Sequence, residues 1–148
     1  MKIQLAMALF SIAGFTSAQE VKPGHLSPGA TPGTYVVALD GKTGGNIKRS
    51  ELAGDAKLQV MYFSGKEMIG DTTQKVVQFK MALFSTDRDP EPDKFSVGTA
   101  LTDEMKALIT THKAGTKIYF ENIQISTNVS GSEARRAMRP LSFTLTEN

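Results

Sequence analysis

A strict alternation of apolar and other side chains in residues 77–83 places the strongest constraint on the fold. The segment reads VQFKMAL, so every second residue, namely Val77, Phe79, Met81 and Leu83, is large and apolar. A period of two puts these four side chains on one face of an extended strand, whereas a helix needs a period of about 3.6. The segment therefore predicts a β-strand with one face in a hydrophobic core and an opposite face that is more exposed to solvent.

Four further segments have the composition of strands, and glycine, proline and polar residues gather between them. The predicted strands are 34–39, 58–63, 117–125 and 141–146. The predicted loops are 64–74, 87–93 and 127–136. The pattern indicates a chain built mainly from strands.

The predicted strand at 117–125 changes phase along its length. Its sequence KIYFENIQI has apolar residues at even positions up to Phe120 and at odd positions from Ile123. A β-bulge at Glu121 and Asn122 would bring both sets to one face, because it adds one residue to one strand of a pair. The alternative is a regular strand that is buried on both faces.

A single α-helix is predicted over residues 102–113. Thr102 is suited to cap its N-terminus, and two acidic residues follow in the first turn. From Met105 to Ile109 the apolar residues recur at helical spacing, which predicts one apolar face. Gly115 has the residue type that commonly ends a helix.

The first eighteen residues have the layout of a secretory signal peptide. A positive charge at Lys2 precedes an apolar stretch up to Phe15, and small residues end the segment at Ala18. The stretch is shorter than the ~20 residues that a membrane-spanning helix needs. We therefore expect cleavage after Ala18, no membrane insertion after cleavage, and a periplasmic or secreted protein.

The remaining chain divides into a linker and one domain. Residues 19–33 contain three Pro-Gly pairs, which suit neither a helix nor a strand and predict a linker, so 34–148 is the expected domain. The chain has no cysteine, which excludes disulfides and thiolate chemistry. Of its two histidines, His25 lies in the linker and His112 at the predicted helix end. We predict no metal site and no cofactor.

Two classes of phosphate-bearing partner are disfavoured. The tripeptide Gly41-Lys42-Thr43 is the ending of a phosphate-binding loop, but the first glycine of that loop would fall at Val36, inside an apolar run. The 17 basic and 15 acidic residues are scattered along the chain, so there is no basic stripe for a nucleic acid. We expect neither a nucleotide site nor a nucleic-acid partner.

The loop 87–93 carries an acidic residue at every second position, which invites a calcium interpretation. Two prolines intervene, however, and the glycine and final glutamate of a calcium-binding helix-loop-helix are absent. A solvated acidic loop is the favoured interpretation, with calcium binding as the alternative.

No catalytic pattern is present in the sequence. It lacks Gly-x-Ser-x-Gly, His-Glu-x-x-His and paired carboxylates on a shared strand face. We therefore expect no catalytic residues and a binding protein. A small-molecule or glycan binder of the cell envelope and an uncharacterised hydrolase remain as alternatives.

Three segments carry a resemblance to a known family. They are GKTGGNIKRSEL (41–52), IYFENI after the helix and Gly115 (118–123), and RPLSF (139–143). In this order and spacing they resemble the C-terminal domain of the gliding-motility protein GldM and its relative PorM, over residues 34–146.

The resemblance implies an immunoglobulin-like β-sandwich of antiparallel strands with one added α-helix, in the periplasm of a Gram-negative bacterium that uses type IX secretion. It further implies a protein-interaction module whose partner is an envelope protein, and it implies that residues 41–52 form a turn after the first strand. Self-association is left open. The sequence lacks the membrane anchor and long stalk of the full-length proteins, so we do not expect a motor role.

The candidate protein-binding residues lie in the glycine-rich turn and at the bulge. Adjacent glycines permit close backbone approach, and the following cations can steer an acidic partner. The candidates are Gly44, Gly45, Asn46, Lys48, Arg49, Glu121 and Asn122. We expect charge reversal of the two cations to leave the thermal stability unchanged. The alternative is that the glycines only form the turn.

Overall fold

A computed structural model describes residues 33–129 and 132–147. The predicted signal peptide and residues 19–32 of the predicted linker lie outside the described residues. The elements are β1 (Thr34–Leu39), β2 (Gly45–Lys48), α1 (Arg49–Ala53), β3 (Leu58–Phe63), β4 (Met68–Gly70), β5 (Gln74–Phe84), β6 (Lys94–Val97), α2 (Asp103–Thr111), β7 (Lys117–Val129), β8 (Ser132–Ala137) and β9 (Leu141–Thr146). No helix in the described part of the chain is long and apolar enough to cross a membrane.

The strands form two sheets, which confirms the prediction of a mainly β sandwich. One sheet has the order β1-β3-β4, and the other has the order β2-β9-β7-β5-β6, with β8 paired to β7. The pairing is antiparallel except between β2 and β9, which run parallel. The described residues form two helices, whereas the sequence predicted one. The helix α1 was missed because its five residues are too few for a recognisable apolar pattern.

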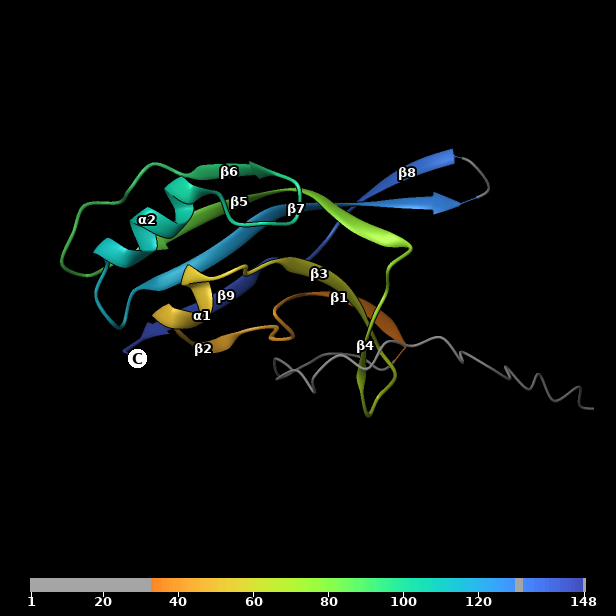
Figure 1. Cartoon of the computed structure of the whole chain (residues 1–148), viewed down its shortest axis with the longest axis horizontal. Coiled ribbons are helices and arrows are strands. Elements are labelled where there is room, and N and C mark those ends of the chain that lie inside the picture. Colours follow the sequence, from red (N-terminus) through yellow and green to blue (C-terminus); the bar gives the residue numbers. More distant parts are fainter. Residues whose placement is uncertain (1–32, 130–131, 148) are drawn as a thin grey trace, which may run out of the picture.

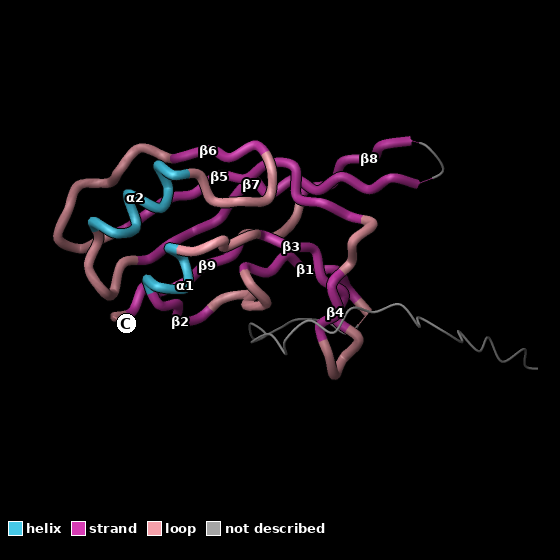
Figure 2. The backbone as a smooth tube through the Cα atoms, viewed as in Figure 1, coloured by secondary structure: helices cyan, strands magenta, loops and turns pink. Residues whose placement is uncertain are grey.

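One face of the six-stranded sheet is covered and holds the core. The two helices lie over one end of this inner face and the three-stranded sheet lies over the other (Figures 1 and 2). Phe120 is central: its ring centroid is 5.8 Å from that of Phe79 and 6.1 Å from that of Phe143, both edge-to-face. Such pairs add about 0.5–1.5 kcal/mol beyond the burial of apolar area. Met105 from α2 and Leu58 from β3 belong to the same buried cluster.

The predicted strand at 77–83 is part of β5, but the face assigned to Val77 was wrong. Phe79, Met81 and Leu83 are buried as predicted, whereas Val76 replaces Val77 in the core and Val77 is half-buried. The register against β7 shifts between Val76 and Gln78, so β5 has one extra residue there. The strict alternation in the sequence concealed this irregularity.

The predicted bulge in β7 is confirmed. The register shifts back between Gln78 and Lys80, where β7 has the extra residue, so the two irregularities compensate. Phe120 and Ile123 are both fully buried. The extra residue is Asn122, with φ of 50°, since Glu121 keeps its pairing with Lys80. Asparagine tolerates this left-handed conformation better than most residues.

The predicted helix exists but ends earlier than expected. Thr102 caps α2 by accepting a hydrogen bond from the Met105 N–H, as its position suggested. The helix ends at Thr111, because His112 adopts an extended conformation as the C-cap. Gly115 therefore lies in the following loop, where its N–H donates to the Leu145 carbonyl at 2.7 Å.

The loop predictions were partly wrong. The segment 87–93 is a loop, as predicted, but β4 interrupts 64–74 and the β7–β8 hairpin occupies most of 127–136. β8 carries two arginines and two alanines, so its strand character depends on pairing with β7 and not on its own composition.

The glycine-rich segment 41–52 is more than a turn. Asp40 and Gly41 both have positive φ and form a tight two-residue hairpin turn, with Leu39 and Lys42 exchanging backbone hydrogen bonds of 2.8 and 2.9 Å. The chain then forms β2 and α1. The glycine of the Gly-Lys-Thr tripeptide is therefore a residue of a hairpin turn.

The bulge gives the first testable prediction. Asn122→Val should lower the free energy of unfolding by about 1–2 kcal/mol, because a β-branched residue is strained in the left-handed region. Asn122→Gly is the matched control and should change it by less than about 0.5 kcal/mol. Denaturant unfolding of both variants measures this, and equal stability of the two would contradict the conformation at Asn122.

Candidate protein-interaction surface

The face of the six-stranded sheet opposite the core is exposed, and we call it the outer sheet face. Alternation along each strand assigns its residues, because the buried residues between them point to the core. Its residues are Asn46, Lys48, Gln78, Lys80, Ala82, Phe84, Phe95, Val97, Lys117, Tyr119, Glu121, Gln124, Ser142, Thr144 and Thr146. Apart from Ala82, all of them are exposed or half-buried.

Apolar side chains are concentrated on the β5–β6 side of the outer sheet face. Phe84 is 51% exposed and packs edge-to-face against Tyr119, with ring centroids 5.4 Å apart. On β6, Phe95 is 69% exposed and Val97 95% exposed. Exposed aromatic and aliphatic side chains that share a surface are typical of interaction sites.

A three-residue ion-pair cluster lies beside these apolar residues. The Lys80 Nζ is 2.9 Å from Glu121 Oε2 and 3.0 Å from Asp93 Oδ2. The hydrogen bond to Glu121, and then that to Asp93, raises the pKa of Lys80 above its ordinary value. Lys80 therefore stays charged at neutral pH, and its charge is already matched by two carboxylates.

The outer sheet face also carries two exposed cations on β2 and β7. Lys48 and Lys117 are exposed, and Lys117 Nζ donates to the Thr144 hydroxyl at 2.6 Å. Asn46 is exposed on the same side. Lys117 lies directly opposite Phe84 in the pairing of β5 with β7, so one lysine adjoins the apolar residues, whereas Lys48 lies on the edge strand β2.

The predicted site residues fall into two groups. The first group shares the outer sheet face and consists of Asn46, Lys48 and Glu121. Asn46 and Lys48 lie on β2, whereas Glu121 lies on β7, two strands away. Asn122 is exposed at the bulge. Gly44 is buried, and Gly45 has φ of 91°, which a residue with a side chain rarely adopts.

Arg49 does not have the position expected of a steering cation. It is half-buried at the start of α1, and its Nη2 donates to the His112 carbonyl at 2.5 Å. That carbonyl lies at the C-terminal end of α2, where a positive charge is favourable. Arg49 therefore joins the two helices, and the expectation that its charge reversal leaves stability unchanged does not fit this contact.

Lys42 also has a structural contact near the start of α1. Its Nζ is 2.5 Å from Glu51 Oε1, while Glu51 Oε2 accepts the Lys48 N–H at 2.7 Å. Glu51 thereby ties the hairpin turn to the first turn of α1. The lysine of the Gly-Lys-Thr tripeptide is thus engaged with a carboxylate of its own chain.

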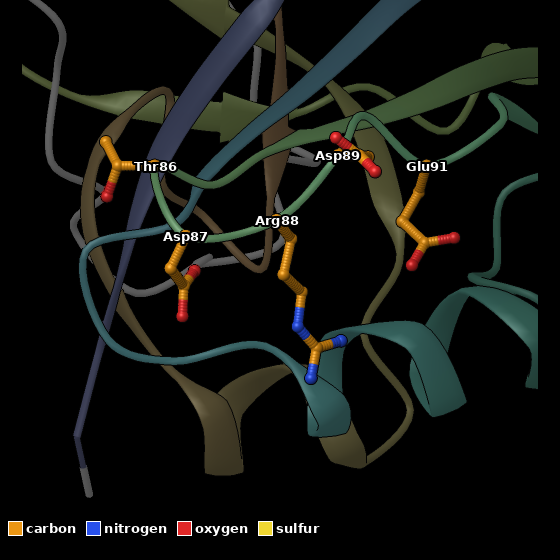
Figure 3. A pocket seen from close by; sticks show the side chains of 5 residues that line it. All are labelled: Thr86, Asp87, Arg88, Asp89 and Glu91. Carbon is orange, nitrogen blue, oxygen red and sulfur yellow. The ribbon is translucent and has the colours of Figure 1, made fainter.

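The acidic loop lines an open hollow with Thr86, Asp87, Arg88, Asp89 and Glu91 (Figure 3). The carboxylates do not converge on one point, and Asp87 points away from Glu91. Asp87 accepts a hydrogen bond from the Ser85 hydroxyl and lies 3.0 Å from Lys113 Nζ. Within the described residues, no group of three or more histidine, cysteine or acidic side chains could hold a metal ion.

Sequence reasoning missed the apolar part of the outer sheet face. Phe95 and Val97 were not assigned to a strand, although an aromatic and a β-branched residue flank Ser96 with period two. Phe84 and Tyr119 lie at strand positions whose outward direction became clear only from the pairing of β5 with β7.

The architecture defines a mainly β sandwich that leaves one broad sheet face open for contacts. The family model of the GldM C-terminal domain matches residues 28–146, and the chain belongs to this family. At the family level it is a module associated with gliding motility and type IX secretion. No curated protein matches the chain. The matched range begins within the predicted linker, five residues before the first described residue, Gly33.

The contact between the helices gives a second prediction. Arg49→Ala should lower the free energy of unfolding by about 1.5–3 kcal/mol, because a hydrogen bond from a charged group to a helix end is lost. Lys48→Ala removes the neighbouring exposed cation and should change it by less than about 0.5 kcal/mol. Thermal or denaturant unfolding compares the two variants. Similar losses of stability in both would contradict a stabilising contact between Arg49 and the end of α2.

The acidic loop gives a third prediction. The Ser85 hydroxyl and then Lys113 lower the pKa of Asp87 from 3.8 to about 2. A carboxylate with a depressed folded-state pKa stabilises the fold above its unfolded pKa, and this contribution is lost as the pH falls from 3.8 to about 2. NMR titration should show this pKa. Lys113→Met should raise it, and Lys66→Met should leave it unchanged. An ordinary pKa in the unaltered protein would contradict the contacts.

Proposed function

We propose that the protein is a non-catalytic interaction module that is exported to the periplasm or cell exterior and binds an envelope protein through the outer sheet face. The signal peptide would direct export and would be cleaved after Ala18. The proposal places the protein alongside gliding motility or type IX secretion, in keeping with its family.

The observation that carries this proposal is the exposed outer sheet face with its apolar edge. Phe84, Phe95 and Val97 retain half or more of their accessible surface in the isolated chain. Apolar side chains lose unfavourable contact with water when a partner covers them. A rigid sheet also holds their backbone in place, so little backbone freedom is lost on binding.

The charge of the outer sheet face indicates an acidic partner. Lys80 is matched by its two carboxylates, whereas Lys48 and Lys117 are exposed without an ion pair among the described residues. Such cations increase the rate of encounter with an acidic surface more than they increase affinity. The preferred partner is therefore a protein with an acidic surface next to an apolar patch.

The two alternative functions have less support on the described surface. A small-molecule or glycan binder commonly offers a concave, largely apolar pocket, whereas the hollow in Figure 3 is lined by four charged residues and a threonine. A hydrolase needs a nucleophile beside a base. The described histidine, His112, is buried, with Nδ1 at 2.7 Å from the Leu108 carbonyl.

A fourth prediction tests the proposed function. The mature protein would be used to capture partners from the envelope of a bacterium with type IX secretion, and affinity would be measured with the purified partner. Lys48→Glu combined with Lys117→Glu should weaken binding about tenfold at low ionic strength and reduce its salt dependence, as expected for lost electrostatic steering. The melting temperature should stay close to that of the unaltered protein.

The matched control is Lys57→Glu combined with Lys66→Glu, which changes the net charge equally but lies outside the outer sheet face. Binding by this control should be nearly unchanged. Equal loss in both double variants would show a dependence on net charge alone and would contradict the assigned surface. A saturable hydrolytic activity of the purified protein would overturn the non-enzymatic function.

A further inference from the structure

The strand β6 is an open edge of the six-stranded sheet. Figure 1 shows it at the margin of that sheet, and among the described residues it pairs only with β5. Its outward side chains, Phe95 and Val97, are exposed. Its single charged residue, Lys94, is half-buried on the inner side, with Nζ 3.5 Å from Glu104 Oε2 of α2. The strand thus lacks the outward charge and the internal proline with which natural edge strands commonly block pairing.

The backbone of β6 presents four groups at this edge that are available to a partner. The Gly98 N–H donates to the Val77 carbonyl at 2.8 Å, in line with the register of β6 on β5. Hydrogen-bonded pairs alternate in an antiparallel ladder, so Ser96 also directs its N–H and C=O groups towards β5. The N–H and C=O groups of Phe95 and Val97 therefore point away from β5, where no other described strand pairs with β6.

The other outer strands of this sheet are less suited to accept a strand. On β2, the Lys48 N–H already donates to Glu51 Oε2 at 2.7 Å, and α1 begins at the next residue. β8 carries Glu133, Arg135 and Arg136 within six residues, and all three are exposed. Charged side chains on an edge strand disfavour the addition of another strand. Of these edges, β6 is the one that is open to a strand.

We propose that the envelope partner adds an extended segment to β6 as a further, antiparallel strand of the six-stranded sheet. Outward backbone groups at every second residue match those of an extended strand, whereas a helix satisfies its own backbone groups internally. The antiparallel orientation is favoured, because parallel pairing is slightly less stable per residue. The inference rests on the proposed function for the class of partner, and it adds the way in which that partner is held.

The outward side chains of β6 define two positions of the added segment. One residue of the segment exchanges two hydrogen bonds with Phe95, and the residue two positions before it exchanges two with Val97. Both of these side chains then lie on the outer sheet face, beside Phe95 and Val97. Aromatic and β-branched residues form favourable cross-strand pairs. A β-branched residue opposite Phe95 and an aromatic residue opposite Val97 therefore fit best.

The inner side of β6 defines two more positions of the segment. The residue between the first two lies opposite Ser96, which is buried and donates its hydroxyl to the Ala100 carbonyl at 2.8 Å, so a small polar residue fits. The residue after the β-branched one lies opposite Lys94, where an acidic side chain forms an opposite-charge pair. From its N-terminus the segment thus reads aromatic, small polar, β-branched, acidic.

A synthetic peptide tests this pairing without the envelope partner. The probe is Ser-Tyr-Thr-Val-Asp-Ser with blocked ends, added to the isotope-labelled mature protein and followed by NMR. At saturating peptide the N–H groups of Phe95 and Val97 should exchange with solvent deuterium about tenfold more slowly, because they become hydrogen-bonded. The Ser96 N–H is directed towards β5 already and should change little.

Backbone methylation of the peptide distinguishes strand addition from docking through side chains alone. In the proposed register the N–H groups of its tyrosine and valine point towards β6, whereas those of its threonine and aspartate point away. N-methylation of the tyrosine and valine should weaken binding about tenfold or more, because two hydrogen bonds are lost. N-methylation of the threonine and aspartate is the matched control and should leave binding within about threefold.

A matched pair of protein variants tests the same edge from the other side. Val97→Pro removes an N–H that points away from β5, so the fold should tolerate it, as edge strands tolerate proline. Peptide binding should weaken about tenfold through the lost hydrogen bond. Val97→Thr keeps both the N–H and a β-branched side chain, and should bind the peptide within about twofold of the unaltered protein. A well-dispersed NMR spectrum checks that each variant is folded.

The outcomes separate this inference from the proposed function. Unchanged exchange of the Phe95 and Val97 N–H groups, or equal loss of binding for the two methylation patterns, would overturn strand addition. An envelope partner that binds Val97→Pro as tightly as Val97→Thr would also overturn it, while leaving the proposed function intact. If the peptide protects the edge of β6 but no envelope protein is captured, the proposed function fails and the site for an extended segment stands.

Discussion

The burial of a single face of the six-stranded sheet is the constraint on which the rest of the structure depends. The edge-to-face contacts of Phe120 with Phe79 and Phe143 link β5, β7 and β9. Each fully buried side chain of this kind contributes about 1.5–3 kcal/mol through removal from water. The three-stranded sheet and the helices are both needed as covers, because neither reaches over the whole inner face (Figure 2). With no disulfide in the chain, this core and its hydrogen bonds hold the fold together.

Two local features help the sheet and the helices to pack around the core. The bulge at Asn122 restores the inward direction of the second half of β7, so Ile123 and Phe120 both contribute to the core. Arg49 joins α1 to the end of α2 through the His112 carbonyl. Both residues were candidates for partner binding from their sequence context. Asn122 remains exposed. Arg49, in contrast, is held by a structural contact and is suited to stabilising the fold and not to steering a partner.

Because all of the cover lies on the inner side, the outer sheet face is left open, and this links fold to function. It carries two kinds of exposed residue: Lys48 and Lys117 are suited to guide an acidic partner, whereas Phe84, Phe95 and Val97 are suited to contact it closely. The free edge of β6 lies at the apolar side of the same face.

The sequence by itself determined the strands β1, β3, β5, β7 and β9, the position of α2 and the bulge, because each depends on local periodicity or capping that neighbouring residues set. It also carried the family resemblance that the match to the GldM C-terminal domain confirms. Only the tertiary structure decided that Val76 and not Val77 enters the core, that β8 is a strand, and that Arg49 contacts α2. These depend on pairing with β7 or on contacts across 63 positions of sequence, as between Arg49 and His112. Periodicity along one strand carries no information about such distant partners.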